Sequence, residues 1–248
     1  MFSRLATALM ALLAPAVMLL MVAQAQTSVP APSGNPSADE IVARMEAMNE
    51  ERVLAQPAFA CERTYILNYH GFPESKHAEM NVRSLQVGAR KEFTILNESG
   101  SGALRSRVLH KMLDTEREAS VGTLREDSRL TRRNYDFSLA SVAATPDGPL
   151  YVLAIKPKVK SKVAWSGRIW VDARDYAVVR AEGQPDKMPS WWTTHSDFVS
   201  TYQKVDGAWL PRQNISETSV RFGGHAHLEI TYRNCSTTSR EYSSPATP

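Results

Sequence analysis

The sequence has 248 residues, of which 22% are charged, and its formal charge at pH 7 is +3. Acidic and basic residues are mixed along the chain, so this small excess does not indicate a nucleic-acid partner. A mildly basic surface is compatible with contact to anionic lipid headgroups, a property that many exported proteins share.

The first 25 residues have the pattern of an export signal. Arg4 is followed by an apolar run over 5–22 and by the tripeptide Ala-Gln-Ala at 23–25. A short basic region, an apolar stretch and an A-x-A site predict a secretory signal peptide, cleaved after Ala25, and a periplasmic protein. A retained membrane anchor stays open because the run is nearly long enough to span a bilayer, although Pro15 interrupts it.

The chain has two cysteines, Cys61 and Cys235. Disulfides persist outside the cytosol, so an even pair in an exported chain predicts one bridge between them. Two free buried thiols remain the other reading. A zinc motif would need four closely spaced ligands, and this spacing does not provide them, so no metal is expected.

The first folded element is expected directly after a flexible stretch. Residues 26–36 are rich in Pro, Ser and Gly, which predicts a linker. Ser37 and Glu40 have the spacing of a capping box, at which a helix begins. Apolar side chains then recur at helical spacing and predict a helix over 38–54, with the stripe Ile41, Met45 and Met48.

Three strands and a second helix follow. Segments 60–71, 76–88 and 89–99 alternate in the manner of strands. In the first of them Arg63, Tyr65, Leu67 and Tyr69 share one face, and Cys61 has the same parity. The helical period returns over 102–118, where one apolar stripe contains Leu104, Val108 and Met112.

The rest of the chain reads as strands. They are expected at 134–143, 149–158, twice within 167–185, and at 193–205, 207–220 and 224–235. In the last strand Ala226, Leu228, Ile230 and Tyr232 alternate with His225, His227, Glu229 and Arg233, which predicts one apolar and one wet face. Cys235 falls on the wet face and Cys61 on the apolar one, so a bridge requires a bulge or an early strand end. Fraying is expected over 237–248.

Two helices and about ten strands joined by short connections predict an α+β fold with an antiparallel sheet. A twisted sheet of that size curls, which leaves a concave side for the two amphipathic helices to cover. A filled core is the default interpretation of the apolar side. Aromatic side chains with polar tips, and methionines that repack around variable partners, favour a ligand-binding hollow instead.

The order of these elements resembles the LolA family of periplasmic lipoprotein carriers and its lipoprotein-sorting relatives. The resemblance covers 37–236 and rests on the segment GRIWVDARDYAVVRAEGQP, with YQKVDGAWLPRQNISETSV and HAHLEITYRNC later in the chain. It implies a curved antiparallel half-barrel with a helical lid, whose hollow binds lipids or lipoprotein acyl chains without a cofactor.

The resemblance also implies which residues would contact a ligand. The strand residues expected to line the hollow are Tyr65, Leu67, Tyr69, Phe93, Ile95, Leu228, Ile230 and Tyr232. The helix residues expected to form its lid are Ile41, Met45, Met48, Val108 and Met112. The chain is expected to act as a monomer.

The sequence gives less support for metal binding or catalysis than for ligand binding. His225 and His227 are two residues apart on one strand face, a spacing found in metal sites but equally expected of exposed histidines. The sequence contains no G-x-S-x-G, P-loop, G-x-G-x-x-G or H-E-x-x-H motif. An enzyme is therefore not expected. The other function kept open is an interaction or sensor module that binds a protein of the inner or outer membrane. Trp191 and Trp192 form either a lipid-interface tip or a packed loop.

Overall fold

The computed structural model describes residues 35–55, 58–88, 90–188 and 190–238. The predicted signal peptide, nearly all of the predicted linker and residues 239–248 of the predicted tail lie outside the described residues. Within these ranges, no helix combines the length and the apolar character needed to cross a membrane.

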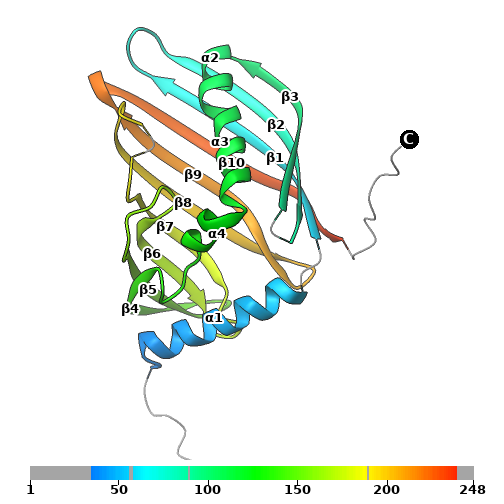
Figure 1. Cartoon of the computed structure of the whole chain (residues 1–248), viewed down its shortest axis with the longest axis vertical. Coiled ribbons are helices and arrows are strands. Elements are labelled where there is room, and N and C mark those ends of the chain that lie inside the picture. The colour runs from blue at the N-terminus through cyan, green and yellow to red at the C-terminus, as the bar shows by residue number, and fades with distance from the viewer. Residues whose placement is uncertain (1–34, 56–57, 89, 189, 239–248) are drawn as a thin grey trace, which may run out of the picture. The chain divides into compact units, whose positions relative to one another are not determined.

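One antiparallel sheet contains all ten strands that the structure describes, in the order β3-β2-β1-β10-β9-β8-β7-β6-β5-β4 (Figure 1). This confirms the predicted α+β class. The strands are β1 Ala58–His70, β2 Lys76–Val87, β3 Arg90–Gly100, β4 Tyr135–Thr145, β5 Gly148–Pro157, β6 Trp165–Asp172, β7 Val178–Pro185, β8 Thr193–Val205, β9 Ala208–Val220 and β10 Gly224–Thr238. Every strand pairs with its neighbour in sequence except β3 with β4, and the remaining pair is β1 with β10.

The first predicted helix is confirmed as α1 (Ala38–Ala55), and its capping box is formed. The backbone N–H of Ser37 donates to the Glu40 carboxylate at 2.8 Å, and the Glu40 N–H donates to the Ser37 hydroxyl at 3.3 Å. This reciprocal pair satisfies N–H groups at the helix start that have no partner within the helix.

The second predicted helix is continuous but irregular. It consists of α2 (Gly102–Leu104), a π-helical turn (Arg105–Leu109) and α3 (His110–Ala119), which together are called the lid segment below. A short further helix, α4 (Gly122–Ser128), was not predicted. Its sequence GTLREDS has only one large apolar residue, so no apolar stripe at helical spacing predicts this helix. A single turn of 3₁₀ helix, Arg221–Gly223, precedes β10.

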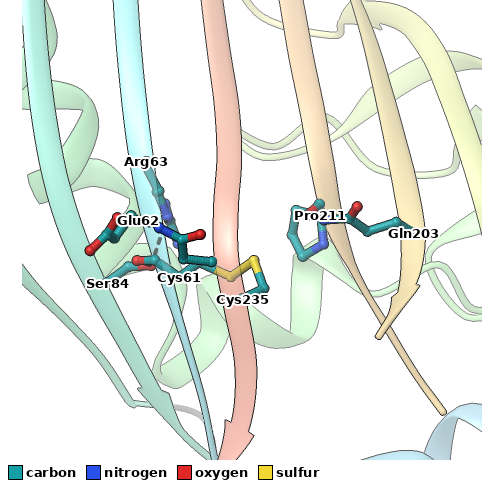
Figure 2. The surroundings of a disulfide bond; sticks show 8 residues. Cys61, Glu62, Arg63, Ser84, Gln203, Pro211 and Cys235 are labelled. Carbon is teal, nitrogen blue, oxygen red and sulfur yellow. Dashed lines mark hydrogen bonds between the residues drawn. A yellow bond between two sulfur atoms is a disulfide. The ribbon is translucent and has the colours of Figure 1, made fainter. Parts of the chain in front are cut away.

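The predicted disulfide is present and joins β1 to β10 across 174 residues (Figure 2). The parity conflict between the two cysteines is resolved by a β-bulge. Ala60 pairs with Ser236 and Glu62 pairs with Arg233, so two residues of β10 face Cys61 alone. Asn234 takes a left-handed conformation at φ 49°, which turns Cys235 to the concave side where Cys61 already points.

Both helical segments lie on the concave side of the open, curved sheet (Figure 1). They cover different halves of it. α1 packs against β4–β7, where the buried cluster contains Tyr135, Leu153, Ile155, Ile169, Val171 and Ala181. The lid segment packs against β1, β2 and β10, and we call these the α1 half and the lid half.

Candidate ligand-binding face

The residues predicted to line the hollow lie mainly in the lid half. Tyr65, Leu67, Leu228 and Ile230 are buried there with Leu109 and Leu113 of the lid segment, and Phe93, Tyr232, Val108 and Met112 are partly buried against them. Tyr69 is half-buried. Ile95, on the edge strand β3, is 41% exposed.

The predicted lid residues divide between the two halves. Ile41 and Met45 of α1 are buried in the α1 half at 0% and 4% exposure, and Met48 is half-buried. Val108 and Met112 belong to the lid half. The two helices therefore do not close one common hollow. Four surface pockets of the described residues have none of the ligand or lid residues predicted from the sequence in their linings.

Strands β8 and β9 lie between the two halves, and their concave side carries small polar side chains around one aromatic residue, Phe198, which packs against the α1 half. Their register with β10 and β7 places five small polar residues on the concave side: Ser196, Ser200, Asn214, Ser216 and Thr218. We call these residues the polar strip. The Ser196 and Thr218 hydroxyls lie 3.0 Å apart, and the Asn214 amide donates to Ser200 at 2.7 Å. The members on β9 are spaced by two residues, but on β8 Phe198 stands between Ser196 and Ser200, so alternation alone would have predicted a polar face only for β9.

A buried arginine is the main polar group under the lid segment. Arg63 of β1 is 4% exposed and points to the concave side (Figure 2). Its Nη1 donates to Glu116 of α3 at 2.8 Å and its Nε donates to Ser84 at 3.0 Å. Lys91 of β3 donates to the same carboxylate at 2.8 Å. These contacts fasten α3 to two strands.

Two of the predicted ligand residues contact this arginine. The Arg63 guanidinium lies 5.0 Å from the ring centre of Phe93 and 4.9 Å from that of Tyr232. Two aromatic faces are thus occupied by a cation, an arrangement that is stabilising for a desolvated guanidinium. The sequence places Arg63 on the inward face, but alternation carries no information about its partner Glu116, which is 53 residues away.

The charges in this cluster shift its pKa values. Burial alone would raise the pKa of Glu116, but the charges of Lys91 and Arg63, with the hydrogen bonds they donate, hold that pKa below its usual range. Burial raises the pKa of Tyr232 and of Tyr65, so both phenols stay neutral. Glu116 is therefore a carboxylate at neutral pH, and its charge holds the lid segment in place.

A second ion cluster holds the other end of the lid segment. Glu98 of β3 accepts hydrogen bonds at 2.6 Å from both Arg105 and His110, which lie in the π-helical turn and at the start of α3. The hydrogen bond from His110 lowers the pKa of Glu98. Gly100 and Gly122 bracket the segment with left-handed backbone at φ 79° and 64°. The lid segment is thus attached by ion pairs near both ends and by apolar packing between them.

α1 makes polar contacts with Arg132, which donates to Glu46, and with the β6–β7 turn inside the stretch GRIWVDARDYAVVRAEGQP. The Asp172 carboxylate accepts from the N–H groups of Arg174 and Asp175 and so shapes this turn. Arg52 of α1 donates to the carbonyl of Asp175, and Arg44 donates to the Tyr176 hydroxyl at 2.9 Å. This turn therefore helps to anchor α1.

The histidines with metal-like spacing are on the convex face. His227 pairs with Glu217 and His195 with Asp197, each partly exposed. His225 is exposed beside Ser219. Among the residues that the structure places, no three His, Cys, Asp or Glu side chains are grouped so that they could hold a metal ion.

Comparison with known proteins yields similarity of structure alone. A scan against protein-family models gave no match, and no curated protein matched the sequence. The chain is similar to a LolA superfamily protein from Nitrosomonas europaea, at 13% identity over 83% of this chain and 95% of that chain, with a TM-score of 0.35. It is also similar to a putative outer membrane lipoprotein-sorting protein domain from Vibrio parahaemolyticus, at 14% identity over 79% and 92%, with a TM-score of 0.43.

A third similar structure is a complex of two proteins. The MucA/MucB complex of Pseudomonas aeruginosa matches at 11% identity over 82% of this chain and 99% of that chain, with a TM-score of 0.29. The descriptions of the first two structures name the LolA and lipoprotein-sorting proteins that the sequence resembles. With TM-scores below 0.5, none of the three decides the function of this chain.

Proposed function

We propose that the mature chain is an exported, non-enzymatic carrier or binder of lipids or lipoprotein acyl chains in the bacterial envelope. The observation that carries this proposal is the lid half, where an apolar sheet face is covered by a separately attached helical segment. Exposing an acyl chain to water costs about 0.8 kcal/mol of free energy for each CH₂ group, so a carrier has to shield the chain. The disulfide supports a compartment outside the cytosol.

In this proposal the ligand enters by displacing the lid segment. Val108 and Met112 are only partly buried, and Met112 is a flexible side chain suited to repacking around a guest. The ion clusters at Glu98 and Glu116 would keep the segment attached while its apolar middle lifts. The described structure would then correspond to the closed, unloaded state.

The direct test is the identity of copurifying molecules. We expect the chain, purified from an envelope extract without detergent, to carry acyl lipids that mass spectrometry detects, and to bind a fluorescent acyl probe that lipid displaces. Repeated preparations with no bound acyl species and no probe binding would contradict a carrier function.

A substitution in the lid segment tests the position of the site. Met112→Asp adds a charge to a partly buried position, so we expect probe affinity to fall about tenfold or more while the protein still folds. Thr115→Asp, on the exposed side of the same helix, is the matched control and should bind normally. Met45→Asp buries a charge at a position that is 4% exposed and should unfold the protein. Equal probe affinity in the Met112 and Thr115 variants would place the site elsewhere.

The polar strip favours a second candidate, the interaction module. Its hydroxyl and amide groups suit the backbone of an extended peptide better than an acyl chain. A peptide of a membrane-protein partner could then lie between the two apolar halves. Asn214→Ala, which removes a donor on the strip, would weaken capture of such a partner and leave binding of the acyl probe unchanged.

A further inference from the structure

Four large aromatic side chains are exposed at one end of the sheet. They are Phe72 at 81%, Trp191 at 65%, Trp192 at 54% and Phe222 at 80%, and we call them the aromatic crest. Phe72 lies in the β1–β2 turn, the tryptophans precede β8, and Phe222 lies in the turn before β10. Such exposure is unfavourable for a soluble surface, and contiguous exposed apolar groups mark interaction sites.

The three loops that carry the crest are held together. The Arg221 N–H donates to the Trp192 carbonyl at 2.8 Å, which joins the β7–β8 loop to the β9–β10 turn. Gly71 and Gly224 approach so closely that a Cβ on Gly71 would lie 2.7 Å from the Cα of Gly224. In Figure 1 the β1–β2 turn and the starts of β8 and β10 accordingly lie at the same end of the sheet.

Contacts among neighbouring side chains hold three of the four crest residues in place. The ring centres of Trp191 and Trp192 are 4.9 Å apart, and those of Trp192 and Phe222 are 5.9 Å apart. The Arg221 guanidinium lies 4.4 Å from the Trp191 ring centre, and its Nε donates to the Trp191 carbonyl. Phe222 has a left-handed backbone at φ 67°, which is unusual for a bulky residue. Asparagine or glycine would suit that backbone better, so folding alone does not account for a phenylalanine there.

We propose that the aromatic crest inserts into the interfacial layer of a phospholipid bilayer. Tryptophan rings beside an arginine are the side chains that lie at the level of lipid headgroups. The charges around the crest also complement anionic lipids: Arg221 has no carboxylate partner among the described residues, whereas Glu74 is paired with Lys76. Aromatic side chains that project from turns are better suited to insertion into a deformable lipid layer than to docking into a preformed pocket of a partner protein.

The crest also borders the lid half. The apolar face of β10 starts at Gly224, beside the crest, and continues through Ala226, Leu228 and Ile230 into the covered cluster. If the proposed carrier function holds, an acyl chain leaving the bilayer at the crest would meet a continuous apolar strand face. Docking itself requires no ligand in the lid half.

The test is flotation of the full mature protein with vesicles. Vesicles of phosphatidylethanolamine and phosphatidylglycerol are compared with vesicles of phosphatidylcholine, and tryptophan fluorescence reports insertion. The variants are the double substitution Trp191→Ser with Trp192→Ser, and Phe222→Asn. Leu54→Ser is the matched control, because Leu54 is 81% exposed at the end of α1, next to the start of β1 and away from the crest.

We expect the wild type to float with the anionic vesicles and to show a blue-shifted fluorescence. The double variant should bind the vesicles about tenfold more weakly, Phe222→Asn should be intermediate, and Leu54→Ser should be unchanged. Wild-type protein that stays unbound, or a double variant that binds as well as Leu54→Ser, overturns the proposal.

A second readout separates this inference from the carrier function. Binding of the fluorescent acyl probe in solution should be the same in the double variant and the wild type. Lost vesicle binding with retained probe binding supports the crest as a docking surface. Retained vesicle binding in the double variant overturns docking at the crest, whatever the probe shows, and absent probe binding in the wild type counts only against the carrier.

Discussion

Reduction of the Cys61–Cys235 disulfide is expected to lower the free energy of unfolding by up to about 5 kcal/mol. The bridge closes a loop of 174 residues, so it removes many conformations from the unfolded chain. It also fixes the β1–β10 pair, which is the one strand pairing of the sheet not made between neighbours in sequence. Without the bridge, that pairing has to be found across most of the domain.

The measurement is urea denaturation with and without a reducing agent, followed by circular dichroism. The Cys61→Ala, Cys235→Ala double variant is the control, since it should be as unstable as the reduced protein and insensitive to the reducing agent. A wild type whose unfolding midpoint does not move, although mass spectrometry shows two free thiols, would contradict the expectation.

Removal of the Glu116 carboxylate is the second large effect. Glu116→Ala leaves Arg63, which is 4% exposed, without its ionic partner, and we expect a loss of about 3 kcal/mol. This is the lower end of the usual cost of removing one partner from a buried ion pair, because Glu116 itself is 30% exposed. Asp114→Ala is the matched control on the same helix. Its partner Arg117 is 51% exposed, so the change should be within about 0.5 kcal/mol.

The pH dependence of stability gives an independent check. The folded-state pKa of Glu116 is lowered, so its contribution is fully present above the unfolded-state value of about 4.3 and is lost as pH falls through the folded value. The stability difference between wild type and Glu116→Gln should therefore be constant from pH 7 to about 5 and shrink below about pH 4. A difference that stays constant down to pH 3 would show that the carboxylate charge does not hold the lid segment.

These effects concern the attachment of the lid segment, so they connect stability to the proposed function. Breaking the Glu116 cluster should loosen α3 and make the apolar face of β1, β2 and β10 accessible more often. In the proposed carrier, the Arg63–Glu116–Lys91 cluster would set how readily the lid half opens.

Much of the fold follows from local sequence patterns. Period-2 alternation marks most of the ten strands, because one sheet face is apolar and the other is wet along them, whereas β5 is buried on both faces. The capping box at Ser37 and Glu40 marks the start of α1. The opposite parity of the two cysteines predicted either a bulge or an early strand end, and the structure has the bulge.

The composition of the candidate site was only partly predictable. Alternation identified Tyr65, Leu67, Leu228 and Ile230 as facing the same side, and they do lie together. It could not show that α1 covers a different half of the sheet from the lid segment, because helical spacing specifies an apolar stripe and not the surface against which it packs. The predicted lid residues were therefore assigned to one hollow, whereas the structure has two covered halves.

What the sequence by itself determined is the ten strands and the two longer helical segments, their order, the apolar face of most strands and the pairing of the two cysteines. The tertiary structure alone decided the contact of Arg63 with Glu116, the meeting of three loops in the aromatic crest, and the register shift between β6 and β7 that leaves Val178 and Ala181 packed in the same cluster. The physical reason is that alternation and helical period arise within one element, whereas these features depend on the register and approach of segments far apart in the chain.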